Sequence, residues 1–142
     1  MARADFYLLA DGTSRARFAC TLANKVWKQG HRLHILAPSR EDASALDDLL
    51  WTFQDISFLP HALVDDADAG APPVTVGWPG AAGGDGDVLI NLSEEIPDSA
   101  ADFGRVAEIV GGEEDLRHRA RTRYKHYRDR GFELHTHDMS AQ

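Results

Sequence analysis

The chain has 142 residues and a formal net charge of −8, with 43% hydrophobic and 27% charged residues. This is the length of one ordinary domain, which buries roughly 68% of its unfolded surface and folds without a metal or a disulfide. The single cysteine, Cys20, excludes an intrachain disulfide and is interpreted as a buried thiol. So acidic a chain is poorly suited to nonspecific binding of nucleic acid.

Membrane insertion and secretion are also disfavoured by the sequence. No apolar run approaches the roughly 18 residues that are needed to cross a membrane. The first residues lack the arrangement of a signal peptide, because their apolar run is too short and no cleavage-like site follows. We therefore expect a cytoplasmic protein with no membrane partner.

The first third of the chain alternates strands with helices. Residues 6–9 form a short apolar run closed by an Asp-Gly turn, which predicts a buried strand. Thr13 or Ser14 can then cap a helix that extends to about Gln29, where a glycine follows as the C-cap. The next strand is predicted over residues 32–37.

The middle of the chain continues this pattern with shorter elements. Ser39 and Asp42 resemble a capping box at the start of a helix over residues 40–51. A short extended piece is predicted at 56–58, and a strand at 74–76 follows an acidic loop.

The last third supplies the clearest strand and the longest helix. Residues 87–92 predict a buried strand, and apolar positions over 103–110 predict a helix. A long helix is expected over 113–130, and 135–142 are expected to be a loose tail. This alternation predicts an α/β domain with a mostly parallel sheet and helices on both faces.

The sequence lacks the motifs that would indicate a catalytic or nucleotide-binding site. The turn at residues 10–14 has one glycine where a dinucleotide fingerprint needs three, and no phosphate-binding loop motif is present. His135, His137 and Asp138 are metal-ligating residue types, but they lie in the predicted tail, without a rigid second shell. We expect no cofactor and no metal. A small nucleotide-binding or hydrolytic α/β enzyme that uses the 11–14 turn remains the alternative.

Basic residues gather in one segment of this acidic chain. Residues 117–130 carry seven lysine or arginine side chains against one aspartate, a net charge of +6 in fourteen residues. An acidic body with one compact basic segment suggests a specific acidic partner that is guided there electrostatically.

Helical periodicity places part of this charge on one stripe. At about 100° per residue, the stripe holds four cations and one aromatic ring: Arg117, Arg121, Tyr124, Lys125 and Arg128. Arg119, Arg123 and Arg130 fall outside it. The stripe suits a ligand with a carboxylate and an apolar anchor, with Val110 as part of an apolar wall. A solvated arginine-rich face is equally compatible with this geometry.

Several motifs occur together in a family-specific order. They are Phe-Tyr-Leu-Leu at 6–9, Leu-Asp-Asp-Leu-Leu-Trp at 46–51, Ser-Phe-Leu-Pro-His at 57–61, Gly-Trp-Pro at 77–79, Asp-Val-Leu-Ile-Asn-Leu at 87–92 and Arg-Tyr-Lys-His-Tyr-Arg at 123–128. In this order and at this length, the chain resembles the chi subunit of the bacterial DNA polymerase III clamp-loader complex.

The resemblance implies a three-layer Rossmann-like single domain over residues 1–134, with no catalytic activity. It also implies an adaptor that binds the acidic C-terminal tail of single-stranded DNA-binding protein (SSB), which ends in Pro-Phe. Contact with nucleic acid is then expected only through SSB. The implied tail site consists of Val110, Arg117, Arg121, Tyr124, Lys125 and Arg128.

A second surface is implied by the same resemblance. It corresponds to Trp51, Phe58 and Pro60, and it binds the psi subunit that links chi to the clamp loader. Some family members use this surface for a repair helicase. From the residues alone, Trp51 is compatible both with core packing and with an apolar patch that binds a partner.

Overall fold

The computed structural model describes residues 2–52, 59–66, 72–81 and 84–139. Within these ranges, seven strands form one sheet in the order β3-β4-β2-β5-β6-β1-β7, and every neighbouring pair is parallel. The strands are β1 (Arg3–Leu8), β2 (Leu33–Leu36), β3 (His61–Leu63), β4 (Val74–Gly77), β5 (Val88–Asn91), β6 (Arg105–Val110) and β7 (Glu133–Asp138).

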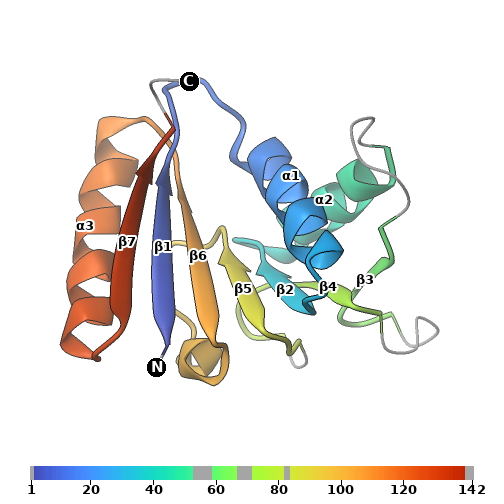
Figure 1. Ribbon diagram of the computed structural model, residues 1–142. Helices are drawn as coiled ribbons and strands as arrows, with labels where there is room; N and C mark the ends of the chain where they lie inside the picture. Colours follow the sequence, from blue (N-terminus) through green and yellow to red (C-terminus); the bar gives the residue numbers. More distant parts are fainter. Residues whose placement is uncertain (1, 53–58, 67–71, 82–83, 140–142) are drawn as a thin grey trace.

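Helices cover both faces of this sheet (Figure 1). α1 (Arg15–Lys28) and α2 (Arg40–Thr52) pack on one face, whereas α3 (Glu114–Asp129) and the 3-10 helix η1 (Asp98–Asp102) pack on the other. The predicted three-layer α/β architecture is therefore confirmed. None of the helices in the described part of the chain is long and apolar enough to cross a membrane.

Serine side chains cap two of the helices, as the sequence predicts. Ser14 Oγ accepts a hydrogen bond from the Arg17 backbone N–H at 3.2 Å, and Ser39 Oγ accepts one from Asp42 N–H at the same distance. Each bond satisfies a backbone donor that the first turn of a helix leaves unpaired. Cys20, on α1, is buried as expected, and burial raises the pKa of its thiol to about 12.

The segment before α3 is a strand, so the prediction of a helix over 103–110 is wrong. β6 lies between β5 and β1, and helices cover both of its faces. A parallel strand that is buried on both faces is apolar nearly throughout. Its apolar positions therefore matched a helical spacing by chance, while its valine and isoleucine content favours a strand.

The end of the chain is also a strand, so the expectation of a loose tail from residue 135 is wrong. β7 pairs in parallel with β1, and the backbone N–H of Met139 donates to Leu8 O at 2.8 Å. β7 is an edge strand whose sequence, ELHTHD, is mostly polar. An edge strand has less apolar surface to bury, so this polar sequence does not indicate a strand. The folded domain extends beyond residue 134, to Asp138 at least.

A buried carboxylate anchors α3 to the sheet. Glu108, on β6, is fully buried and accepts hydrogen bonds from Arg123 Nε at 2.9 Å and Tyr127 Oη at 2.6 Å. The side-chain amide of Asn91, on β5, donates to the same carboxylate at 2.8 Å. Burial and this carboxylate raise the pKa of Tyr127, so its hydroxyl remains a donor. Arg123 and Tyr127 lie one turn apart, so the network fixes the rotation of α3 about its axis.

This network makes a testable prediction about stability. Arg123→Ala leaves the Glu108 carboxylate buried without its cation, which costs about 3–5 kcal/mol in the free energy of unfolding. Arg119→Ala removes an equal charge from the same helix, but the ion pair of Arg119 with Glu94 is solvent-exposed and is worth under about 1 kcal/mol. Urea unfolding of both variants measures the difference. Equal losses would contradict the anchoring role.

Candidate functional site

A groove lies between α3 and the two strands beside it, β1 and β7. Its volume is about 350 Å³. The groove is lined by side chains from all three elements: Phe6, Leu8, Arg117, Ala120, Arg121, Tyr124, Lys125, Arg128 and Thr136. Every cation of the predicted stripe lines it, together with Tyr124. The stripe that helical spacing predicts therefore forms part of the lining of the groove.

The inner surface of the groove is apolar. Phe6 and Leu8 lie two residues apart on β1, so both point to the α3 face of the sheet. The ring of Tyr124 lies 5.4 Å from that of Phe6, centre to centre, and remains 37% exposed. An aromatic or aliphatic side chain that entered here would meet an aromatic pair that is already packed together.

The four cations of the groove differ in how they are held. Arg117 Nη2 donates to Leu9 O at 3.0 Å, while its buried Nε has no acceptor among the described residues. Within the described part of the chain, Arg128 makes only an exposed ion pair, at 3.4 Å, with the residue that follows it. Arg121 and Lys125 make no ion pair with any residue that the structure describes. An incoming carboxylate can therefore pair with Arg121 or Lys125 without breaking an ion pair within the described part of the chain.

Val110 does not belong to this groove. It is 1% exposed and packs in the core at the end of β6. The apolar wall comes instead from Phe6, Leu8 and Thr136, which sequence reasoning missed. The alternation of apolar residues on β1 could have indicated the first two. Thr136 is not predicted, because the sequence of its strand indicates a loose tail.

The cations that helical periodicity excluded do lie elsewhere. Arg123 is buried against Glu108, and Arg119 pairs with Glu94 on the far side of α3. Arg130 follows the last turn of the helix and does not line the groove. The sorting of basic residues by helical phase therefore matches their positions in the fold.

The second predicted surface lies at the other end of the sheet. Trp51, at the end of α2, is 57% exposed, which contradicts the reading of this residue as simple core packing. Its ring lies 4.4 Å from that of His61, on the short strand β3, which the sequence did not predict. Pro60, which directly precedes His61 in the chain, is half-buried. Phe58, like the predicted extended piece at 56–58, lies outside the described residues.

The turn proposed for the alternative nucleotide site is filled by the protein itself. A side chain at Gly112 would collide with the backbone of Asp11, so the loop after β6 lies directly against this turn. Arg15 reaches across the ends of two strands, donating from Nε to Ile109 O at 3.0 Å and from Nη2 to Leu92 O at 2.8 Å. Phosphate binding needs open backbone N–H groups at this position, whereas Gly112 lies against the N–H of Asp11 and the N–H of Thr13 donates to Ala10 O at 3.1 Å.

The comparison with known proteins identifies the family. Residues 1–135 match the family described as "DNA polymerase III chi subunit, HolC". The chain belongs to this family. DNA polymerase III subunit chi of Pseudomonas aeruginosa is 40% identical over 142 residues, which cover 98% of each chain. The subunit of Escherichia coli K12 is 36% identical over 143 residues, covering 96% of this chain and 97% of that one. The resemblance predicted from the motifs is therefore confirmed.

A solved structure extends the comparison at the level of the fold. The crystal structure of T4 UvsW is similar to the chi-family chain with a TM-score of 0.71 and 9% sequence identity. The match covers 99% of this chain and 42% of that protein. At so low an identity the likeness concerns the α/β fold alone.

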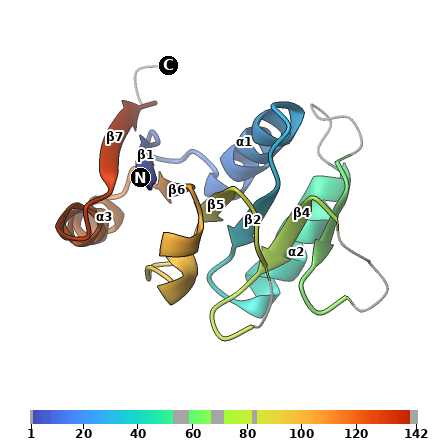
Figure 2. The ribbon, with the colours of Figure 1, turned by 60° about the horizontal axis from the view of Figure 1, so that its bottom comes forward.

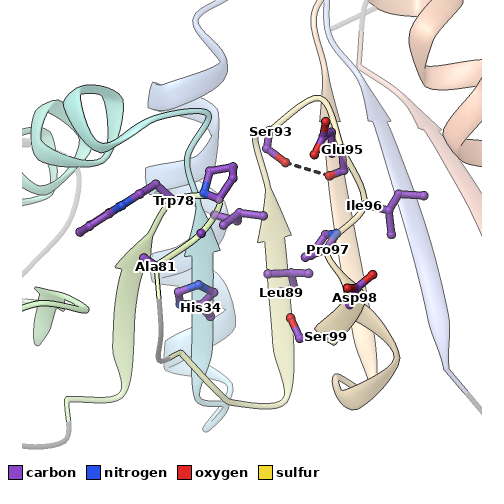
Figure 3. Close-up of a pocket in the computed structure, with 13 residues that line it drawn as sticks. His34, Trp78, Ala81, Leu89, Ser93, Glu95, Ile96, Pro97, Asp98 and Ser99 are labelled. Carbon is purple, nitrogen blue, oxygen red and sulfur yellow. Dashed lines mark hydrogen bonds between the residues drawn. The ribbon is translucent and has the colours of Figure 1, made fainter.

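The chi-family chain has a further cleft, of about 290 Å³, beside strands β2 and β5 (Figure 3). His34 and Leu89 come from these strands, while residues 78–81 line one side of the cleft and Ser93 with residues 95–99 line the other. Its charged lining residues are the carboxylates Glu95 and Asp98, with no lysine or arginine, so the cleft is unsuited to a phosphate group. Among the described residues, no group of three or more His, Cys, Asp or Glu side chains is placed to hold a metal ion.

His34 is almost completely buried beside this cleft. It is 6% exposed, and its Nδ1 lies 2.7 Å from Thr75 Oγ1. Burial lowers the pKa of the ring to about 4, so the imidazole is neutral at pH 7.

This burial predicts a pH dependence of stability. Between the unfolded pKa of about 6.5 and the folded pKa of about 4, the unfolded chain binds one more proton than the folded protein. Stability is therefore present above pH 6.5 and falls by about 3 kcal/mol as the pH drops to 4. His34→Gln should remove this part of the slope while leaving the contributions of the carboxylates. Urea unfolding across this pH range tests it, and parallel curves for the two proteins would show the prediction to be wrong.

Proposed function

We propose that this chi-family protein is a non-catalytic adaptor of bacterial DNA replication, which binds the acidic C-terminal tail of SSB in the groove of α3. The observation that carries the proposal is the combination of four cations with an apolar, aromatic inner surface in one hollow. The second half of the proposal is a link to the clamp loader through psi, at the surface around Trp51. A protein with this role in bacterial DNA replication acts in the cytoplasm.

The chemistry of the groove fits a tail that is acidic and ends in Pro-Phe. The terminal phenylalanine fills the space beside Phe6 and Tyr124, where it adds an aromatic contact. The terminal carboxylate and the acidic side chains before it meet Arg121 and Lys125, and charge-assisted hydrogen bonds are the stronger ones available here. The Nε–H of Arg117 is a further donor within the groove wall.

The proposed partner surfaces are far enough apart to be occupied together. α3 lies beside β7 at one end of the sheet, and α2 packs on β3 and β4 at the other (Figures 1 and 2). Six inter-strand spacings of about 4.8 Å put the two outer strands ~29 Å apart. Such a molecule can hold SSB at one end and psi, or a repair helicase, at the other.

Binding of the tail is tested with a peptide that ends in Asp-Ile-Pro-Phe. Calorimetry should give a micromolar affinity that weakens as salt increases, because exposed ion pairs are screened. Arg121→Ala combined with Lys125→Ala should weaken binding at least tenfold. The matched control, Arg119→Ala with Arg130→Ala, removes the same charge from outside the groove and should leave the affinity within about twofold.

Two results would rule out the tail site. One is the absence of binding at high micromolar peptide. The other is an equal loss of affinity in the two double variants, since a general charge effect does not need the groove. Amidation of the terminal phenylalanine provides a chemical control, because it removes the carboxylate while keeping the ring.

The second surface makes a separate prediction. Trp51→Ala removes an exposed ring of the kind that dominates protein interfaces, so the affinity for psi should fall at least tenfold. The affinity for the SSB tail peptide should stay unchanged, since the groove lies at the other end of the sheet. Affinity chromatography with purified psi, followed by calorimetry, measures both. Undiminished psi binding by this variant would exclude Trp51 from the interface.

A further inference from the structure

Two large hydrophobic side chains stand out as exposed in the described part of the chain. They are Trp51, 57% exposed, and Tyr124, 37% exposed. Tyr124 lies among the cations of the α3 groove. The surroundings of Trp51 carry the opposite charge.

The sequence around Trp51 carries a negative charge as large as the positive charge of residues 117–130, spread over about twice the length. Residues 40–66 contain seven aspartate or glutamate side chains against the single Arg40, a net charge of −6. Arg40 is itself engaged, because its Nη2 lies 2.9 Å from Asp65 Oδ2 and its guanidinium lies over the ring of Trp78. The charge that this segment presents to a partner is therefore negative.

The helix and the neighbouring strand bring these carboxylates to the tryptophan. Asp47 and Asp48 precede Trp51 by four and three residues on α2, so all three share one face. The ring of His61 contacts Trp51, and its Nε2 lies 3.4 Å from Asp47 Oδ1. Burial raises the pKa of the Asp47 carboxyl, whereas the charge of His61 acts to lower it.

We propose that this Trp51 surface, formed by Trp51, Asp47 and Asp48 on α2 and by Pro60 next to His61, binds a basic segment of a partner protein that carries a lysine or arginine beside an apolar side chain. The inference deepens the proposed function, since it names the chemistry of whatever links this end of the molecule to the clamp loader. A cation can lie over the face of the indole while pairing with Asp48, and the apolar side chain packs against Pro60.

The charge of the ligand distinguishes the partner of the Trp51 surface from the ligand of the α3 groove. An acidic tail that approached Asp47 and Asp48 would meet like charges, which cost several kcal/mol in an interface. Nucleic acid is disfavoured for the same reason. The two ends of the sheet thus select partners of opposite charge, and neither partner competes well for the site of the other.

The test uses two matched peptides that share leucine and phenylalanine residues at the same positions, with lysines in one and glutamates in the other. Each is titrated into the isotope-labelled full chain and followed by NMR, in which the indole N–H of Trp51 is a distinct probe. The lysine peptide should shift this signal together with those of Asp47 and Asp48. The glutamate peptide should instead shift the signals of Tyr124 and its neighbours on α3.

Variants make the assignment specific. Asp48→Lys should weaken binding of the lysine peptide about tenfold, because it reverses an exposed charge of the surface. Asp102→Lys makes the same change at an exposed position on η1 and should leave the affinity within about twofold. Equal shifts of the Trp51 signal with both peptides, or no shift with either, would overturn the proposal.

Two further readings remain distinguishable in the same experiment. If the Trp51 signal moves with protein concentration alone and sedimentation shows a dimer, the surface binds a second copy of this chain and the proposal is wrong. The SSB tail peptide, titrated in parallel, reports on the α3 groove. Failure of that peptide to bind rejects the groove proposal without affecting the result at Trp51.

Discussion

The buried carboxylate of Glu108 is the constraint on which the functional surface depends. A charge taken out of water needs close donors, and α3 supplies two of them in Arg123 and Tyr127. Because Arg123 is drawn inward, the residues two before and two after it, Arg121 and Lys125, are turned toward the groove. One ion pair inside the protein therefore decides which cations outside it are available to a partner.

A second buried carboxylate secures the other wall of the groove. Asp5 lies on β1 with its side chain fully buried, and it accepts hydrogen bonds from Arg3, Arg105 and His137. Burial alone would raise the pKa of Asp5, but the bonds from Arg3 and His137 and the charge of Arg105 hold it below its usual value. Since His137 belongs to β7, this contact ties the edge strand to the sheet. The groove thus lies between two elements that are each held by a buried acid.

The sequence predicted the parts of this site that one helix can determine alone. Helical periodicity fixes the direction of each side chain within α3, so Arg121 and Lys125 were placed together without any tertiary information. Strand pairing puts Val110 in the core and Thr136 in the groove, and the sequence does not reveal that pairing. A strand buried on both faces shows no alternation, and an edge strand shows too little apolar character to be recognised. The interior of the groove could be found only once β1 and β7 were paired.

The arrangement of charge gives a physical reason for the proposed adaptor to be built on such a sheet. A parallel sheet is rigid and wide, so it keeps its two ends ~29 Å apart, several Debye lengths at physiological salt. At that distance salt screens the attraction between the basic groove and the acidic Trp51 surface almost completely. Neither surface is therefore neutralised by the other, and each keeps its charge available to a partner. Helices on opposite faces of the sheet, α3 and α2, carry the two surfaces, so the proposed partners would approach from different directions.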